Sequence, residues 1–228
     1  MWNISDVKTK GREAFKANYW KSVLVSFILA MVTGVAYSST SAGSNTGTDA
    51  SAHDLSSGEQ LALLGIVGGV IGIGLIIGLL IRIFIKNPLE VGCYNFFKKN
   101  VENTPADLGA LKEGFSDFGH IFCTLFLRDL FLLLWTCLFL IPGIVKAYSY
   151  RMVPFIIKDN PELSATEVIT RSREMMNGNK WKAFLLDLSF IGWILLSIIT
   201  LGIASFFWVG PYIQSTEAAL YLELKNKQ

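Results

Sequence analysis

A charged amphipathic run that leads directly into a long apolar run occurs three times in this chain. Five residues of the first copy recur 161 positions later in the third: Arg12, Glu13, Asn18, Trp20 and Lys21 return as Arg173, Glu174, Asn179, Trp181 and Lys182. A fainter second copy begins at Lys112-Glu113. An apolar run of about 20 residues is long enough to cross a bilayer as a helix. The repeat therefore predicts one membrane unit that is used three times.

The overall composition supports a membrane protein. Hydrophobic residues make up 52% of the 228 residues and charged residues 17%, whereas a soluble domain carries about 25% charged residues. The mean hydropathy is +0.45. The net charge of +2 is too small to suggest a nucleic-acid partner. We therefore expect an integral membrane protein that contacts lipid and no nucleic acid.

The apolar runs predict an all-α fold with six transmembrane helices. The expected spans are Trp20–Tyr37, Leu61–Ile85, Gly119–Ile141, Ile144–Ile157, Trp181–Leu201 and Gly202–Leu224. Pro142-Gly143 is expected to form the tight turn between the third and fourth spans, and Pro211 to kink the sixth. The chain is expected to be one domain, 1–228. Its repeats cover about 4–100, 104–160 and 164–228.

Each repeat is expected to begin with an amphipathic helix at the membrane interface. The buried face of the first holds Val7, Gly11, Ala14 and Phe15, matched in the third by Val168, Ser172, Met175 and Met176. A Ser164–Glu167 capping box predicts the start of the third helix, and Gly178 its end. For the second we expect Thr104 as the N-cap, Pro105 at the first helical position, and an apolar stripe of Leu108, Leu111, Phe115 and Phe118.

The distribution of positive charge predicts the topology. Residues 1–21, 82–118, 151–182 and 225–228 contain every lysine and arginine except Arg128 and Lys146. Residues 38–60 contain none and are rich in serine, threonine, glycine and asparagine, which predicts a flexible external loop. Because cytoplasmic segments carry an excess of lysine and arginine, we expect both termini in the cytoplasm.

The second predicted span is rich in glycine. Its G-x-x-x-G pairs are Gly65/Gly69, Gly68/Gly72 and Gly74/Gly78. Small residues at this spacing allow close helix packing in lipid. A gate or flexible element is the alternative interpretation.

Ionisable residues inside the predicted spans are the first candidate site. They are Arg128, Asp129, Lys146, Arg151 and Asp187. Such groups are costly in lipid, so they usually face the bundle interior, a water-filled cavity or one another. The hairpin around Pro142 is expected to bring Asp129 near Arg151, and Asp187 to pair with Arg128 or to approach the inner surface. These residues either form an ion-pair network that fixes the helices or line a polar cavity for an anionic or zwitterionic ligand.

Basic residues of the amphipathic helices are the second candidate site. Lys8, Arg12, Lys16, Arg173, Lys180 and Lys182 are placed to contact anionic headgroups, each worth roughly 1 kcal/mol near the surface. The alternative is that they only anchor the topology.

Four separated blocks of sequence resemble a known family. They are Asn18-Tyr19-Trp20-Lys21, Asn87-Pro88-Leu89-Glu90-Val91-Gly92, Ile141-Pro142-Gly143-Ile144, and the block from Ser172 through Trp193 to Pro211-Tyr212. They resemble the domain of unknown function 975 family of bacterial integral membrane proteins. The resemblance implies a multi-pass protein of the bacterial plasma membrane and supplies no activity and no catalytic residues.

No enzymatic activity is expected. The sequence contains no H-E-x-x-H, G-x-S-x-G or Walker A motif. His53 and His120 are far apart, so we expect neither a metal site nor a cofactor. The leading hypothesis is a transporter-like or lipid-handling module whose polar intramembrane site binds a small amphipathic or peptide ligand. The alternative is a membrane scaffold or immunity-type protein that binds a protein or peptide partner.

Overall fold

The computed structural model describes residues 2–33, 65, 67–70, 72–74, 78, 85–102 and 105–227. Among these residues the protein is all-helical and contains no strand. The elements are α1 (Ile4–Ala17), α2 (Tyr19–Thr33), α4 (Asn87–Glu102), α5 (Gly109–Lys112), the 3₁₀ helix η2 (Glu113–Phe115), α6 (Phe118–Leu138), α7 (Leu140–Ser149), α8 (Val153–Asp159), α9 (Ala165–Met175), α10 (Lys180–Leu188), α11 (Ile191–Ile199), the π-helix η3 (Ser205–Val209) and α12 (Gly210–Lys225). The external loop predicted at 38–60 and most of the span predicted at 61–85 lie outside the described residues.

Two helices of the described chain are long and apolar enough to cross a membrane. They are Phe118–Leu138 and Lys180–Ile199, the second of which takes α10 and α11 together. Tyr19–Thr33 is apolar and shorter. Large apolar side chains on these segments are exposed, including Leu133 at 60%, Leu138 at 63% and Ile199 at 77%. An exposed apolar surface of this kind marks a contact with a membrane, a protein partner or a ligand.

The buried faces predicted for the first and third amphipathic helices, and the start and end predicted for the third, are confirmed, whereas their position at a membrane interface stays a prediction. The expected face of α1 is buried, and so are the four matching residues that begin at Val168. α9 starts with the Ser164–Glu167 capping box, and Gly178 has a φ of 73° two residues after Met176. The 3.6-residue periodicity of these two segments is therefore sufficient to identify both faces.

The prediction for the second amphipathic helix is wrong in its start and in part of its face, although Leu111 packs against the core as expected. The predicted N-cap, Thr104, lies outside the described residues. The helix begins at Gly109 rather than Pro105, and Leu108 and Phe115 are 37% and 48% exposed. The buried face instead carries Ala110 and Gly114. A side chain at Gly114 would meet the carbonyl oxygen of Pro88. This segment packs on α4 by backbone contact, so small residues occupy its buried face.

Three of the predicted spans are interrupted in the structure. The chain turns at Phe139, between α6 and α7, and not at Pro142-Gly143. Pro142 lies in the first turn of α7, where its missing N–H has no intrahelical acceptor to lose. The fourth expected span is two helices, α7 and α8, with Pro154 at the start of α8. The fifth is broken between α10 and α11, and the sixth consists of η3 and α12.

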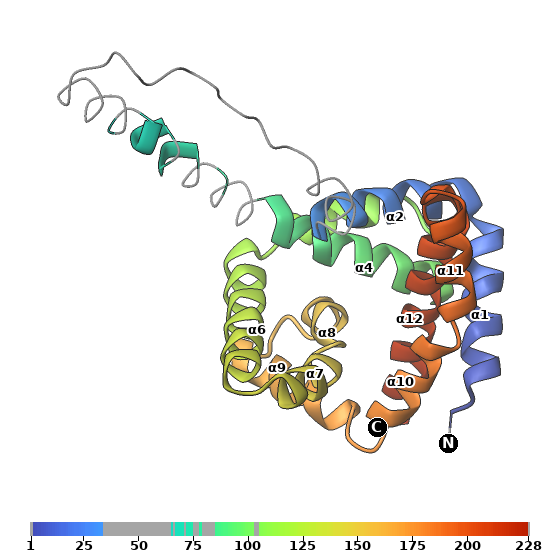
Figure 1. Cartoon of the computed structure of the whole chain (residues 1–228). Coiled ribbons are helices and arrows are strands. Elements are labelled where there is room, and N and C mark those ends of the chain that lie inside the picture. Colours follow the sequence, from blue (N-terminus) through green and yellow to red (C-terminus); the bar gives the residue numbers. More distant parts are fainter. Residues whose placement is uncertain are drawn as a thin grey trace, which may run out of the picture.

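Each amphipathic segment packs against the helix that ends the preceding repeat. α1 lies along α12, in the most extensive helix contact of the described chain. The short α5–η2 segment lies against α4, and α9 lies against α8 and α6. The threefold repeat itself stays a prediction. Figure 1 shows α8 in the middle of the arrangement, surrounded by α4, α6, α9 and α12.

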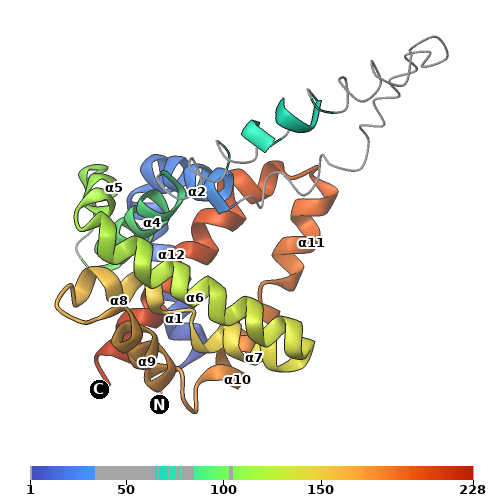
Figure 2. The same ribbon diagram turned by 90° about the vertical axis from the view of Figure 1, so that its left-hand side faces the viewer.

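The centre of the core joins the last helices of the three repeats. The Phe155 ring of α8 stacks on Tyr221 of α12, with centroids 4.9 Å apart, and lies 5.0 Å from Tyr94 of α4. One turn further on, the Asp159 carboxylate accepts hydrogen bonds from Lys98, from Tyr221 at 2.7 Å and from Lys225 at 2.5 Å. Both ends of the described chain lie on the same side of the molecule (Figures 1 and 2).

Candidate functional site

Arg128, near the middle of α6, is held by two carboxylates. Its Nη1 lies 3.1 Å from Glu90 Oε1 of α4, and its Nε and Nη2 lie 2.9 and 2.8 Å from Asp129 Oδ1. The side chains of Arg128 and Glu90 are only 13% and 6% exposed. Sequence reasoning had not identified Glu90 as a partner, although it is the acidic residue of the Asn87–Gly92 block. The buried charge of Arg128 is thus compensated within the protein.

Arg151, in the bend between α7 and α8, forms the second ion-pair network. Its Nε lies 2.7 Å from Glu217 Oε1 of α12, and its two terminal nitrogens lie 2.8 and 3.0 Å from the Asp187 carboxylate of α10. The Tyr148 hydroxyl donates to Asp187 at 2.8 Å. The guanidinium therefore uses the planar, bidentate geometry that favours arginine over lysine.

These partners differ from the expected ones. Asp187 pairs with Arg151 rather than with Arg128 or the inner surface. Asp129 pairs with its neighbour Arg128 rather than approaching Arg151. Lys146 lies with Nζ 4.5 Å from the centroid of the Trp135 ring, across the α6–α7 hairpin. The five intramembrane candidates are thus distributed over three separate places and do not form one site.

The candidate headgroup contacts divide into two groups. Lys8 donates to Ser189 Oγ at 3.1 Å, and Lys182 donates to the Trp2 carbonyl oxygen at 2.6 Å. These two lysines join the start of the chain to α10. Arg12, Lys16 and Arg173 are exposed, and Lys180 is half-buried. The exposed group keeps the expected role in lipid contact as a prediction.

A cavity of about 870 Å³ lies between α2, α11, η3 and α12. Its walls come from Ser26, Leu29, Ala30 and Thr33 of α2, Ile194, Ser197 and Ile198 of α11, Ser205, Phe206 and Val209 of η3, and Gly210, Ile213 and Gln214 of α12, with Tyr94, Leu201 and Gly202. On α2 and α11 these residues occupy the halves remote from Trp20 and Trp181. None of the predicted charged residues lines the cavity. The walls are mostly apolar, with a few hydroxyl groups and one amide.

The π-helix gives this cavity its shape. Pro211 has no N–H to donate to the preceding turn, and the Gly210 N–H bonds Ser205 O, five residues back. π-bulges frequently occur at functional sites. A side chain at Gly210 would come within 2.7 Å of both Ser205 O and Ser26 Oγ. Glycine therefore allows α2 to approach the start of α12 closely, beside the cavity.

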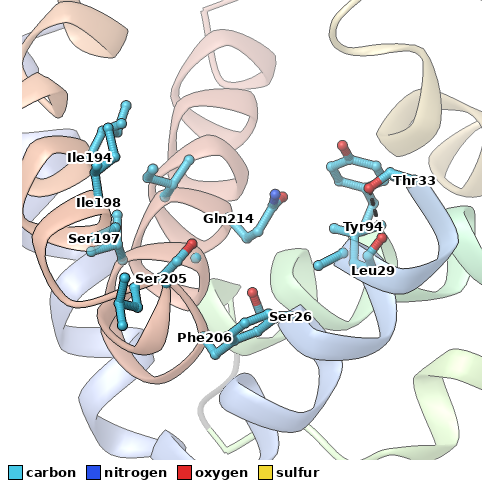
Figure 3. A pocket seen from close by; sticks show the side chains of 16 residues that line it. Ser26, Leu29, Thr33, Tyr94, Ile194, Ser197, Ile198, Ser205, Phe206 and Gln214 are labelled. Carbon is cyan, nitrogen blue, oxygen red and sulfur yellow. Dashed lines mark hydrogen bonds between the residues drawn. The ribbon is translucent and has the colours of Figure 1, made fainter. Parts of the chain in front are cut away.

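Gln214 supplies the most distinctive polar group of the cavity. Its Oε1 is buried and has no hydrogen-bond partner among the described residues. Figure 3 shows its side chain extending between Ile194 and Ile198 on one side and Tyr94 and Leu29 on the other. By contrast, the hydroxyls of Thr33 and Ser197 donate to carbonyl oxygens of their own helices. A buried amide oxygen without a partner costs about 1 to 3 kcal/mol, so a bound group that donates to it would be favoured.

Sequence reasoning missed this cavity because none of its described lining residues carries a charge. The signals that could have pointed to it are the predicted kink at Pro211 and Gln214, an amide inside a predicted span. Both lie in the part of the chain that matches a known family.

No curated protein and no solved structure matches the chain. The family model described as "Protein of unknown function (DUF975)" matches residues 138–228, which include α11, η3 and α12. Over these residues, the match confirms the resemblance to that family found in the sequence.

Proposed function

We propose that this protein is a multi-span membrane protein that binds a lipid-sized amphiphile in the cavity between α2, α11, η3 and α12. It acts as a lipid-handling module and not as an enzyme. The proposal places it in the bacterial plasma membrane, as the family resemblance implies, with both termini on the cytoplasmic side.

The exposed apolar surface supports insertion into a membrane. It extends over the α6–α7 hairpin and along α11, through Leu134, Ile141, Leu195 and Ile198 among others. Trp20 and Trp181 occupy matching positions where an apolar segment begins, and they are 74% and 69% exposed. Exposed tryptophans at such places are typical of a membrane interface.

Because the charged residues in the predicted spans are already paired, we place the ligand site elsewhere than the sequence suggested. Arg128 and Arg151 each meet two carboxylates at hydrogen-bonding distance. An anionic ligand at either arginine would have to displace a carboxylate that is already well placed. We therefore assign the two networks to helix positioning and place the ligand in the uncharged cavity.

The cavity itself is the observation that carries the proposal. Its volume falls in the range of about 300 to 1,000 Å³ that accommodates a single small ligand. The mostly apolar walls suit an alkyl chain, and Gln214, Ser26 and Ser205 offer polar groups for one end of it. In the proposed topology the cavity lies in the outer half of the bilayer, because α2 and α11 start at the cytoplasmic side.

Photo-crosslinking of the full-length protein in phosphatidylcholine nanodiscs tests this proposal. The probe is a long-chain alcohol with a diazirine in its alkyl chain, and mass spectrometry locates the labelled residues. We expect labelling on α2, α11 and α12 at the residues that line the cavity. Ala30→Trp fills the cavity and is expected to reduce this labelling at least tenfold.

Ala147→Trp is the matched control, since Ala147 is exposed on α7 and does not line the cavity. It introduces the same aromatic surface and is expected to leave the labelling unchanged. Equal labelling of the cavity residues in wild type and Ala30→Trp, with both proteins folded, would show that the cavity holds no amphiphile.

A further inference from the structure

We infer that the occupant of this cavity is a single-chain amphiphile with an uncharged, hydroxyl-bearing head that bonds to Gln214. This inference rests on the proposed function and defines the class of ligand. It follows from the charge, the hydrogen-bonding groups and the size of the cavity.

The cavity offers no charge to a ligand. None of the described residues that line it is an aspartate, glutamate, lysine, arginine or histidine. Moving an ionic head into such a place without a partner costs several kcal/mol. The nearest charged residue of α12 is Glu217, one turn after Gln214, and it is occupied by Arg151 at 2.7 Å. A carboxylate, phosphate or ammonium head therefore has no partner in this cavity.

The unpaired amide oxygen of Gln214 restricts the chemistry of the ligand's polar head further. Gln214 Oε1 is the one buried, unpartnered side-chain atom among the described residues that line the cavity. A hydroxyl both donates and accepts, so it satisfies the Gln214 amide in either orientation of its oxygen and nitrogen. An ester or ether oxygen only accepts and leaves Oε1 unpaired. The site thus favours an alcohol over an ester of the same chain length.

The size and position of the cavity favour one chain. Its volume suits one ligand of moderate size, and Ile194, Ile198 and Leu29 provide apolar walls around the Gln214 side chain (Figure 3). Ser26 and Ser205 lie on the same lining and add hydroxyls beside Gln214 for a head with more than one oxygen. A monoacylglycerol has this combination of one chain and an uncharged hydroxyl head.

Competition against the diazirine-bearing alcohol in nanodiscs tests the inference without a variant. The competitors are monooleoylglycerol, oleate at pH 8 and methyl oleate, which share one acyl chain. We expect monooleoylglycerol to compete at least tenfold better than either of the others. Equal or better competition by oleate would refute the uncharged head, while labelling in the cavity would still support the proposed function.

Gln214→Leu tests the assigned residue. It is expected to remove the preference for monooleoylglycerol over methyl oleate, about tenfold, and to leave binding of methyl oleate in place. For each competitor, its competition in Gln214→Leu is divided by its competition in wild type. Because the same competitor is used with both proteins, its partition into lipid cancels. An unchanged preference in folded Gln214→Leu would refute the role of the amide. Loss of all competition, together with unchanged labelling in Ala30→Trp, would overturn the proposed function itself.

Discussion

Replacing Arg151 by methionine is expected to destabilise the protein by about 3 to 5 kcal/mol, the usual cost of removing one partner of a buried ion pair. The Arg151 side chain is 17% exposed, and its loss leaves two carboxylates behind. Glu217 is only 9% exposed and loses its guanidinium partner, whereas Asp187 is 36% exposed and keeps the Tyr148 hydroxyl. Most of the cost should therefore come from Glu217.

A double-mutant cycle locates this cost. Glu217→Gln removes the charge and keeps nearly the same volume, so Arg151→Met/Glu217→Gln should recover much of the stability lost in Arg151→Met. The coupling energy between the two positions is expected to be about 1 to 3 kcal/mol. The assay is reversible unfolding of the purified protein in detergent micelles, followed by tryptophan fluorescence.

Lys146→Met is the control for removal of a cation nearby in the chain, on α7. Lys146 meets the Trp135 ring at 4.5 Å, an interaction worth about 0.5 to 1 kcal/mol at an exposed site. A loss below 1 kcal/mol in Arg151→Met, similar to that in Lys146→Met, would refute the assignment of the Arg151 network to helix positioning. Arg151 would then again be a candidate for contact with a ligand.

Two further predictions concern helix packing and acid stability. A side chain at Gly11 would come within 2.6 Å of the Thr216 backbone, whereas one at Gly119 meets nothing within 4 Å. Both alanine variants gain the same helix propensity, so unfolding experiments should find Gly11→Ala about 1 to 3 kcal/mol less stable than Gly119→Ala. Burial raises the pKa of Asp159, but its hydrogen bonds from Lys225, Lys98 and Tyr221 outweigh burial and hold the pKa below the ordinary value. Its contribution is thus present above about pH 4 and lost as pH falls through the folded-state pKa. The stability difference between wild type and Asp159→Asn should shrink on titration toward pH 3, and a constant difference would contradict this account.

The sequence predicted the amphipathic helices wherever apolar side chains make the contact. α1 and α9 bury Phe15 and Met176 at matching positions, and their periodicity reveals both faces. The second segment escaped this reasoning because its contact with α4 is between backbones, at Gly92 and Gly114. Hydrophobic periodicity measures the side chains that are present, and a glycine contact leaves no apolar signal.

The charged residues were identified from the sequence, but their partners were not. Local spacing along a hairpin suggested Asp129 for Arg151, whereas the actual partners lie on other helices, at Asp187 and Glu217. The bend at Tyr150–Met152 ends α7 and redirects α8 into the core. The pairing of Arg151 with residues of α10 and α12 depends on this bend. The sequence predicted one straight span over these residues, which has no bend.

The position of the cavity can be related to the predicted repeat. In two interfaces, an apolar helix that begins a predicted repeat forms an ion pair with a residue late in the preceding one. These pairs are Arg128–Glu90, between α6 and α4, and Asp187–Arg151, between α10 and the bend after α7. The third interface joins α2 to α12, and here Glu217 is already bound to Arg151.

On the described α2 the one charged residue, Lys21, bonds Asp107 and does not line the cavity. Ser26 stands 161 residues before Asp187, at the matching position of the repeat, and it packs against Gly210 instead of forming an ion pair. α2 and α12 approach closely at that contact, and beyond it the walls diverge around Gln214. If the missing ion pair keeps this interface open, Ser26→Asp should perturb the cavity and its labelling far more than Ser26→Asn, which introduces a side chain of the same shape without the charge. The cavity therefore lies where the predicted threefold arrangement lacks an ion pair, and the proposed ligand occupies this interface.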